Sequence, residues 1–409
     1  MLPDMIHAEH TYSALILLVG VTVILAYLLK AGLRRLRVPG LVGYMLLGLG
    51  LRVLDQRWSL MSTEADAVFG FLAQVGVVAL LFRIGLESNL QGLLRQLPRA
   101  GPILAGNIVL SALGGYAVGR WLGLGLVPSL FAAVSLTATS VGVCMAVWRE
   151  KEKLNTANGE LLVDVAELDD ISGVGLMAVL FAVVPALAAG NGATVWPEVV
   201  RTGGLFLVKL SAFVLACVLF SRYVEERLTN LFRCLGQRET TMLLVAGAGF
   251  IIAAAAGWLG FSLAIGALLA GLLFSRDPEA VKIDTSFESL YELFTPFFFI
   301  GIGLNLSPAA LPHGLGVGAA LFLAAVVAKV VGAGLPALLT TSRGGALLIG
   351  LSMVPRAEIA MIVMQRGQSL GDWAVPPRLY AGMVVVAATT CTLAPVLLSR
   401  LLDRCATDG

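Results

Sequence analysis

Apolar blocks, each about 20 residues long, follow one another along most of the 409-residue chain. A helix of that length crosses the hydrocarbon core of a bilayer, which is about 30 Å thick. Hydrophobic residues make up 58% of the chain and charged residues only 13%, so a soluble globule could not bury every block as a core helix. The sequence therefore predicts an all-α, polytopic membrane protein.

Thirteen candidate transmembrane spans can be counted. They cover approximately residues 11–30, 39–53, 66–86, 100–121, 127–147, 160–187, 202–221, 240–258, 260–275, 289–306, 314–340, 344–365 and 378–399. The last two apolar blocks before residue 280 are separated at the turn-forming string GWLGF. The tail after the last span has about ten residues, so we expect residues 1–409 to form a single transmembrane domain without a soluble regulatory domain.

The basic residues of the connections are distributed unequally between the two sides of the membrane. With the amino terminus outside, 18 of them fall on the inner side and 6 on the outer side. The inner set is Lys30, Arg34, Arg35, Arg37, Arg95, Arg99, Arg149, Lys151, Lys153, Arg222, Arg227, Arg233, Arg238, Arg276, Lys282, Arg343, Arg400 and Arg404. The positive-inside rule therefore predicts an outside amino terminus and a cytoplasmic carboxyl terminus.

Cysteines and histidines give no sign of a zinc site, a disulfide framework or a metalloprotease. The cysteines have no CxxC spacing, and the histidines do not form HExxH. These residues are Cys144, Cys217, Cys234, Cys391, Cys405, His7, His10 and His313. We expect the cysteines to be small apolar fillers.

Four acids occur within seven residues of one predicted span, in the string VDVAELDDISGVG. They are Asp164, Glu167, Asp169 and Asp170. Ionised groups at this depth normally face the protein interior or a water-filled cavity and have a partner. Asp169 and Asp170 are adjacent, about 100° apart around a helix, so one can face a cavity while the other faces a neighbouring helix.

Four basic residues lie inside spans. Arg83 and Lys209 are close enough to helix ends to extend toward the interface. Lys329 lies deep in ALFLAAVVAKVVGAGLPALL and needs a buried partner. Arg356 and Glu358 are two residues apart and cannot form an i,i+4 pair, so each must reach another helix or be satisfied near Pro355.

This set of charges predicts a cation site coupled to protons. A carboxylate that opens onto a water-filled funnel can bind either a monovalent cation or a proton, so that the two compete. A neighbouring carboxylate paired with Lys329 would form an ion pair that breaks and re-forms as the site fills, and the lysine would carry a second proton. A permanent, purely structural ion pair is the alternative interpretation.

Two stretches have the composition of interrupted transmembrane helices, which line the binding sites of many transporters. The first, SLTATSVGVCM, contains Thr137, Thr139, Ser140 and Gly142, and the second, TPFFFIGIGLNLSP, contains Gly301, Gly303 and Asn305. They belong to the fifth and tenth candidate spans, which predicts a repeat of five spans. Close helix packing is the alternative for either stretch.

The strings LLFRIGLES, TATSVGV, LDDISG, FFFIGIGLNL, AKVVGAGLPA and MVPRAEIAMIV occur in this order along the chain. Together they resemble the membrane domain of the cation/proton antiporter superfamily, in particular bacterial sodium/proton antiporters of the NapA type. The resemblance covers essentially the whole chain. It implies inverted repeats with two crossing discontinuous helices, and a homodimer whose core domains move against a dimerisation domain.

The resemblance also implies roles for individual residues. Asp170 matches the aspartate that binds the ion or proton, Asp169 its neighbour, and Lys329 the lysine that pairs with that neighbour. Residues 137–140 match one crossover, residues 301–305 the other, and Arg356 and Glu358 match a segment that stabilises the core. Together with the two aspartates, the oxygen-bearing Thr139 and Ser140 complete the candidate cation site. An Asp-Asp pair with a lysine resembles the electrogenic subgroup.

Asp164 and Glu167 depart from the pattern, since small or apolar residues usually precede the aspartate pair. Glu167 lies three residues before Asp170 and therefore on its face of the helix. It is a candidate accessory group: a proton relay, a second cation ligand or a residue of the cytoplasmic mouth.

The expected function is exchange of a monovalent cation, Na⁺ first and also Li⁺, for protons by alternating access in a bacterial inner membrane. No cofactor, enzymatic activity or nucleic-acid partner is expected. A potassium/proton antiporter, or an exporter of another ion, is the first alternative, and a passive cation channel is an alternative from a different class. An intramembrane aspartyl protease is excluded because its Tyr-Asp and Gly-x-Gly-Asp strings are absent.

Overall fold

The computed structural model describes residues 2–35, 38–59, 61–88, 90–189, 195–220, 223, 238–275 and 284–404. Its α-helices are α1 (Leu2–Arg35), α2 (Gly40–Trp58), α3 (Thr63–Glu87), α4 (Leu90–Trp121), α5 (Leu126–Thr137), α6 (Val141–Glu150), α7 (Ala157–Ala189), α8 (Val195–Phe220), α10 (Arg238–Trp258), α11 (Leu263–Phe274), α13 (Asp284–Leu304), α14 (Leu311–Ala337), α15 (Arg343–Ser352), α16 (Glu358–Leu370) and α17 (Pro377–Arg404). A short 3₁₀ helix, η3 (Pro308–Ala310), precedes α14.

The predicted all-α membrane fold is confirmed. Counting α5 with α6 and α15 with α16 as one interrupted segment each, the 15 α-helices of the described ranges form 13 segments. The predicted separation at GWLGF is also present, because α10 ends at Trp258 and α11 begins at Leu263. Within the described residues, eight helical segments, one of them α5 and α6 taken together, are long and apolar enough to cross a membrane.

The segments before and after α8 form two inverted repeats. Equivalent helices make equivalent contacts in the two repeats. α2 packs on α13 as α11 packs on α3, and α1 packs on α2 as α10 packs on α11. α4 packs directly against its counterpart α14. The interrupted pair α5/α6 then corresponds to α15/α16, the fifth and twelfth segments. The expected five-span repeat is therefore wrong, because α8 intervenes and matching segments lie seven apart.

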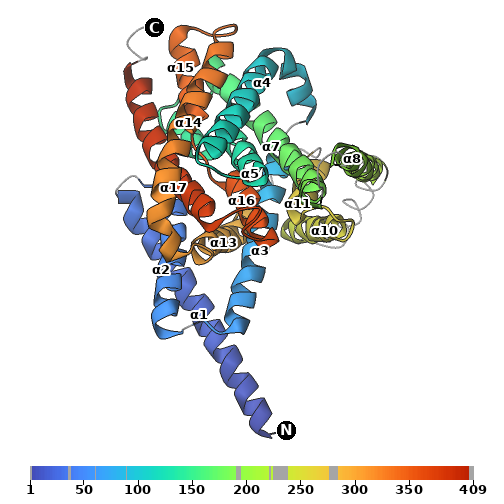
Figure 1. Ribbon diagram of the computed structural model, residues 1–409, viewed down its shortest axis with the longest axis vertical. Helices are drawn as coiled ribbons and strands as arrows, with labels where there is room; N and C mark the ends of the chain where they lie inside the picture. Colours follow the sequence, from blue (N-terminus) through green and yellow to red (C-terminus); the bar gives the residue numbers. More distant parts are fainter. Residues whose placement is uncertain are drawn as a thin grey trace.

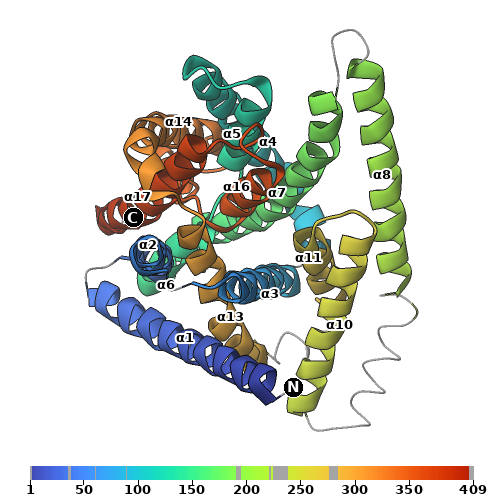
Figure 2. The ribbon, with the colours of Figure 1, turned by 60° about the horizontal axis from the view of Figure 1, so that its bottom comes forward.

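The helices gather into two bundles (Figure 1). The core bundle contains α4–α7 and α14–α17, and the flanking bundle contains α1–α3, α10, α11 and α13. α8 packs against α7 of the core bundle and α11 of the flanking bundle, and Figure 2 shows it at the edge of the molecule between them. It therefore connects the two repeats in space as well as along the chain.

The two interrupted helices meet inside the core bundle. Ala138 to Ser140 separate α5 from α6, and Met353 to Ala357 separate α15 from α16. The Ser140 N–H donates to the carbonyl of Pro355 at 2.9 Å, which joins the two breaks. Pro355 explains the second break, because proline lacks an N–H and disfavours helical conformation at the residue before it. Two crossing discontinuous helices are thus confirmed.

The predicted position of the second break was wrong. α13 continues to Leu304, and its Gly303 lies in a close contact with α2: a Cβ on Gly303 would overlap the Met45 carbonyl, and one on Gly48 would overlap the carbonyl of Ile300. Asn305 ends the helix, where its N–H and side-chain amide both donate to the Gly301 carbonyl, at 3.0 and 2.9 Å. Small residues suit close packing as well as an interruption, so their pattern could not distinguish the two.

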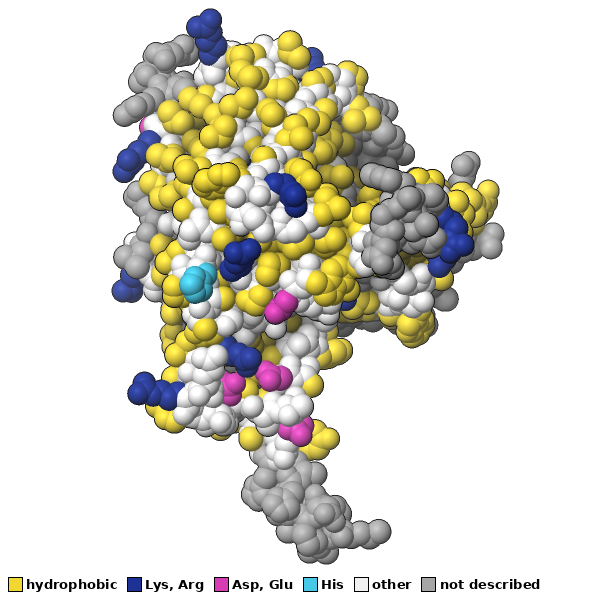
Figure 3. Space-filling model, viewed as in Figure 1, with side chains coloured by type: hydrophobic (Ala, Val, Ile, Leu, Met, Phe, Trp, Pro, Cys, Tyr) yellow, Lys and Arg dark blue, Asp and Glu magenta, His cyan; other side chains and the backbone are white. Residues whose placement is uncertain are grey.

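The outer surface is mostly hydrophobic, and Figure 3 shows charged side chains only at scattered places on one face. Large apolar side chains on it include Leu17, Phe71 and Trp258, which are 68%, 68% and 89% exposed. Cys144, Cys217 and Cys391 are buried free thiols. Several residues of the sequence argument lie outside the described ranges: Cys234, Cys405, Arg37, Arg222, Arg227, Arg233, Arg276 and Lys282.

Candidate functional site

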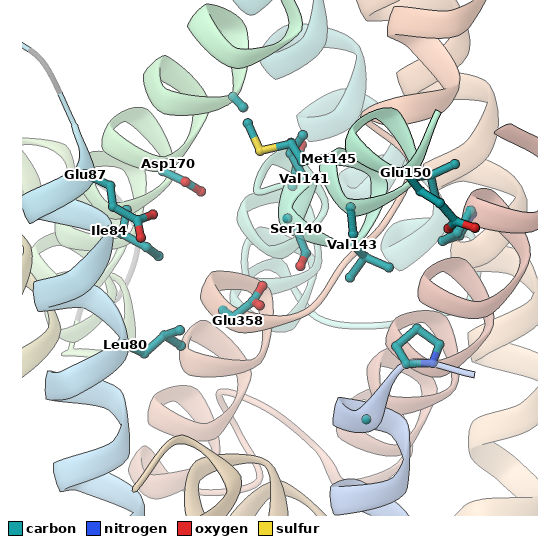
Figure 4. Close-up of a pocket in the computed structure, with 18 of the residues that line it drawn as sticks. Leu80, Ile84, Glu87, Ser140, Val141, Val143, Met145, Glu150, Asp170 and Glu358 are labelled. Carbon is teal, nitrogen blue, oxygen red and sulfur yellow. The ribbon is translucent and has the colours of Figure 1, made fainter. Parts of the chain in front are cut away.

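A cavity of about 1210 Å³ separates the two bundles on one side of the molecule. Its walls come from α1, α3 and α13 of the flanking bundle and from α6, α7, α16 and α17 of the core bundle. Basic residues from the carboxyl-terminal ends of α1 and α17 and from the turn after α6 line its outer part: Lys30, Arg34, Lys151 and Arg400. Ser140, Asp170 and Glu358 lie around its inner part, with Glu87 on the facing helix α3 (Figure 4).

Asp169 and Asp170 lie on opposite sides of the cavity wall. Asp170 lines the cavity, whereas Asp169 is only 1% exposed and lies within the core bundle. The cause is the turn of about 100° between adjacent residues on α7. One carboxylate is therefore accessible from the cavity, and its neighbour is sealed from it.

Asp169 accepts hydrogen bonds from two other elements. Its Oδ1 accepts from the Nδ2 of Asn107 on α4 at 2.6 Å, and its Oδ2 accepts from the Thr139 N–H at 2.8 Å. The Lys329 Nζ lies 4.0 Å from Oδ1, at the outer limit of an ion pair. The structure thus brings the two predicted partners together but gives Asp169 closer partners than the lysine.

Lys329 is fully buried and uses the interrupted helix for its own hydrogen bonds. Its Nζ donates to the Thr137 carbonyl at 2.5 Å and to the Thr139 Oγ1 at 2.7 Å. The carbonyl is available because the helix stops there and leaves its last C=O groups without intrahelical partners. The α5–α6 break therefore serves both members of the Asp169–Lys329 pair.

Arg356 occupies the other break and is also fully buried. Its Nη1 donates to the carbonyls of Met353 and Pro355, both at 3.0 Å, and its N–H donates to the Thr390 Oγ1 at 3.0 Å. The guanidinium thereby satisfies carbonyls that the end of α15 leaves free. Glu358 begins α16 and lines the cavity, so these two residues lie in separate surroundings and do not pair with each other.

The remaining residues expected at the site divide between the cavity and the bundle contact. Glu167 lines the cavity beside Asp170, whereas Asp164 is not part of its wall. Gly303 belongs to the α2–α13 contact, Gly301 faces Ala73 on α3, and Asn305 ends α13; none of the three lines the cavity.

Sequence reasoning missed a charged wall opposite Asp170. Arg83 donates from its Nε to Glu87 Oε1 at 2.7 Å, and its guanidinium carbon lies 4.4 Å from the ring centroid of Tyr291. All three residues line the cavity. The i,i+4 spacing of Arg83 and Glu87 could have predicted their ion pair. No sequence pattern could have predicted that Tyr291 on α13 lies beside Arg83. Asn107, a polar residue in the middle of an apolar span, was also overlooked.

The bundles touch at the end of the site opposite the cavity. The Tyr380 hydroxyl donates to the Ile302 carbonyl at 3.0 Å in a buried contact, and the Arg366 Nη2 lies 3.4 Å from the Gln74 Oε1. These contacts join α17 to α13 and α16 to α3. The site is therefore open on one side and closed on the other.

Comparison with known proteins agrees with this architecture. A family model described as sodium/hydrogen exchanger, transmembrane, matches residues 20–404. The high-affinity Na⁺/H⁺ antiporter NhaS3 of Synechocystis is 28% identical over 355 residues, covering 84% of this chain and 74% of its own. The Na⁺/H⁺-K⁺ antiporter GerN of Bacillus cereus is 26% identical over 373 residues, covering 89% and 90%.

A solved structure shares the fold. The sodium proton antiporter MjNhaP1 of Methanocaldococcus jannaschii at pH 8 superposes with a TM-score of 0.69 at 16% identity, over 94% of this chain and 96% of that one. The match of the family model extends over nearly the whole chain, including both interrupted helices and the aspartate pair. The chain therefore belongs to the sodium/hydrogen exchanger family of transmembrane transporters.

Proposed function

We propose that this chain is a secondary active transporter that exchanges a monovalent cation, Na⁺ first and also Li⁺, for protons by alternating access. The observation that carries the proposal is the separation of two adjacent carboxylates: Asp170 lines a cavity that is open on one side, while Asp169 is sealed beside a buried lysine. The names of the relatives, which include Na⁺/H⁺ antiporters, support the same reaction.

The cation binds at Asp170 in this proposal. Thr139 and Ser140 also line the cavity, and hard cations prefer carboxylate, hydroxyl and carbonyl ligands of the kinds that these residues carry. A proton competes for the Asp170 carboxylate, so the site is occupied either by the cation or by a proton. Asp169 contributes negative charge from behind the cavity wall, and Glu167 contributes as an accessory acid.

A second proton moves on Lys329, which makes the exchange electrogenic. The 4.0 Å separation of Lys329 Nζ and Asp169 Oδ1 supports this step, because the lysine already has two other acceptors and does not depend on the carboxylate alone. When the cation is present, the lysine releases its proton. When the cation leaves, the lysine is protonated again.

Alternating access requires the cavity to close and the opposite contact to open. The basic residues at the cavity mouth support a cytoplasmic opening by the positive-inside rule. We place the protein in a bacterial inner membrane, with the amino terminus outside and the carboxyl terminus inside. We further propose a homodimer and transport without a cofactor.

Potassium/proton exchange is the second candidate. The relative GerN carries both Na⁺ and K⁺ in its name, and residue identities do not encode the sub-ångström differences in ligand geometry that select between the two ions. A passive channel is disfavoured by the contacts that close the site opposite the cavity, Tyr380 to Ile302 and Arg366 to Gln74.

Purified protein in liposomes with an internal pH dye tests the proposal. Pulses of Na⁺, Li⁺ and K⁺ are given in turn, with empty liposomes as the control. Proton movement driven by Na⁺ and Li⁺ supports the proposal, and a response to K⁺ alone selects the second candidate. Cation flux without proton movement would indicate a channel, and absence of any flux would refute all three.

A further inference from the structure

The mouth of the cavity is basic, although the proposed substrate is a cation. The mouth is lined by Lys30, Arg34, Lys151 and Arg400. Carboxylates, among them Asp170 and Glu358, line the inner part. A cation that enters from this side therefore passes positive charge before it reaches the negative charge that binds it. The positive-inside rule explains an excess of basic residues on one side of a membrane, but not their position around a cavity.

Ion pairs compensate only part of this charge. The Nζ of the lysine on α1 lies 3.3 Å from Glu292 Oε1, and the Nζ of the lysine after α6 lies 2.6 Å from Asp403 Oδ1. Arg34 and Arg400 are exposed, and neither forms an ion pair with a carboxylate of the described ranges. Glu150, which also lines the cavity, pairs with neither of them. The two guanidinium groups are thus available to an anion.

The two arginines belong to different bundles. Arg34 lies in the last turn of α1 in the flanking bundle, and Arg400 lies close to the carboxyl-terminal end of α17 in the core bundle. Both line the same cavity. An anion at the mouth therefore meets a guanidinium group from each of the two bundles.

Guanidinium groups suit phosphate better than other anions of similar size. Each is planar, is charged at any physiological pH and can donate two parallel hydrogen bonds to phosphate oxygens. Both arginines are also at the ends of helices that reach the proposed cytoplasmic surface, where the head groups of anionic phospholipids lie. A phosphate group can therefore arrive on a lipid or from solution.

We propose that the mouth binds a phosphate-bearing anion at Arg34 and Arg400, and that this anion increases the apparent affinity for the cation. The uncompensated arginines lower the local concentration of cations at the mouth, and a bound phosphate removes that effect. The regulatory part of the proposal rests on the proposed exchange of a cation for protons. The anion site itself does not depend on that exchange.

Binding is measured first, by thermal unfolding of the full-length protein in a neutral detergent. A ligand that binds the folded state raises the melting temperature in proportion to its occupancy. Short-chain phosphatidylglycerol, short-chain phosphatidylcholine and inorganic phosphate are titrated separately. We expect phosphatidylglycerol to raise the melting temperature of the parent protein and phosphatidylcholine to leave it unchanged. A rise with inorganic phosphate as well identifies phosphate in solution as a second source, and no rise with either anion would refute the proposal.

Variants locate the anion on the protein. Arg34→Gln and Arg400→Gln should each lose most of the rise in melting temperature that the anion causes. Arg35→Gln is the matched control, because Arg35 is exposed in the same turn of α1 but does not line the cavity. It should retain the rise of the parent. An equal rise in all four proteins would show binding elsewhere and overturn the assignment.

Transport tests the effect on the cation. In liposomes of phosphatidylcholine, addition of phosphatidylglycerol should lower the sodium concentration for half-maximal proton movement about threefold in the parent. Arg34→Gln and Arg400→Gln should already have the lowered value in phosphatidylcholine, because the substitution removes the charge that the anion neutralises. They should respond less to phosphatidylglycerol than Arg35→Gln does. Any response common to all four proteins reports the general surface potential of the membrane.

Ionic strength separates this electrostatic role from a structural one. Choline chloride screens the mouth, so it should reduce the difference between the parent and Arg34→Gln in phosphatidylcholine. A difference that salt leaves unchanged, or equal half-saturation in the two proteins without salt, would contradict neutralisation of the mouth.

The two readouts distinguish this site from the proposed exchange. If the parent moves no cation while Arg34→Gln and Arg400→Gln lose the anion-dependent rise in melting temperature, the proposed exchange fails and the anion site stands. If sodium-driven proton movement occurs but neither readout depends on the two arginines, the exchange stands and the anion site is refuted.

Discussion

The cavity side and the buried side of the site use charge differently. On the cavity side, Asp170, Glu167 and Glu358 line a space large enough for water and a cation. On the buried side, Asp169, Lys329 and Arg356 are 1% exposed or less and are held by backbone groups of the two helix breaks. The two sides are one residue apart on α7.

Neighbouring carboxylates can therefore have different roles, because they differ in exposure and in hydrogen bonding. A group that lines an aqueous cavity can exchange its ligand without breaking the protein's own contacts. A buried charge must keep its partners, because an uncompensated charge is costly. Substitutions on the cavity side should therefore change transport more than stability, and those on the buried side should change both.

The largest expected effect is that of Asp170→Asn, which should reduce cation-driven proton movement to the level of empty liposomes. Its thermal unfolding should match that of the parent protein, because Asp170 is on the cavity side. Liposome flux and a melting curve measure the two quantities. Retained sodium-coupled proton flux would contradict the role of Asp170 as the ion-binding group on the cavity side.

Lys329→Ala should destabilise the protein by about 3–5 kcal/mol, since it leaves the buried Asp169 without its cation. A melting curve measures this loss, and Lys151→Ala, which breaks the more exposed 2.6 Å pair with Asp403, is the matched control with about 0–1 kcal/mol expected. Equal losses in the two variants would contradict the assignment of Lys329 to the buried side.

Charge movement separates a proton carrier from a structural lysine. Lys329→Gln that still folds should be electroneutral or inactive, and adding Asp169→Asn should recover part of the stability because both partners are then neutral. Transport of the single variant under an imposed membrane potential is the measurement. A response to potential equal to that of the parent would leave Asp170 as the proton carrier, without the lysine.

Glu167→Gln should shift the pH of half-maximal exchange by about one unit if its charge lies within about 6 Å of the bound ion. Asp164→Asn, on the same helix but outside the cavity wall, is the control and should shift it less. The pH profile of sodium-driven proton movement checks both. Identical profiles for the two variants would remove Glu167 from the site.

The smallest expected effect concerns the contact that closes the opposite side. Tyr380→Phe removes the hydrogen bond to the Ile302 carbonyl and should weaken the closed arrangement by about 0.5–1.5 kcal/mol, or about 2- to 10-fold in the ratio of the two states. Spin labels on α13 and α17 measure the change in their separation. Tyr27→Phe, at an exposed position on α1, is the control.

The amino-acid sequence determined the membrane class, the number of helical segments found in the described residues and the presence of a charged site. These follow from one-dimensional properties: an apolar run of span length must be a helix in lipid, and a mid-span charge such as Lys329 must find a partner. The adjacency of Asp169 and Asp170 likewise fixed that they point in different directions. For these properties, no knowledge of neighbouring helices was needed.

Only the tertiary structure decided which helix is interrupted and which groups meet. Gly301 and Gly303 suit a break or a close contact equally well, and the packing of α13 on α3 at Gly301 and on α2 at Gly303 selected the contact. Asn107 is 62 residues from Asp169 along the chain, and they meet because α4 packs on α7. A hydrogen bond between separate helices depends on their relative placement, which local sequence patterns do not encode.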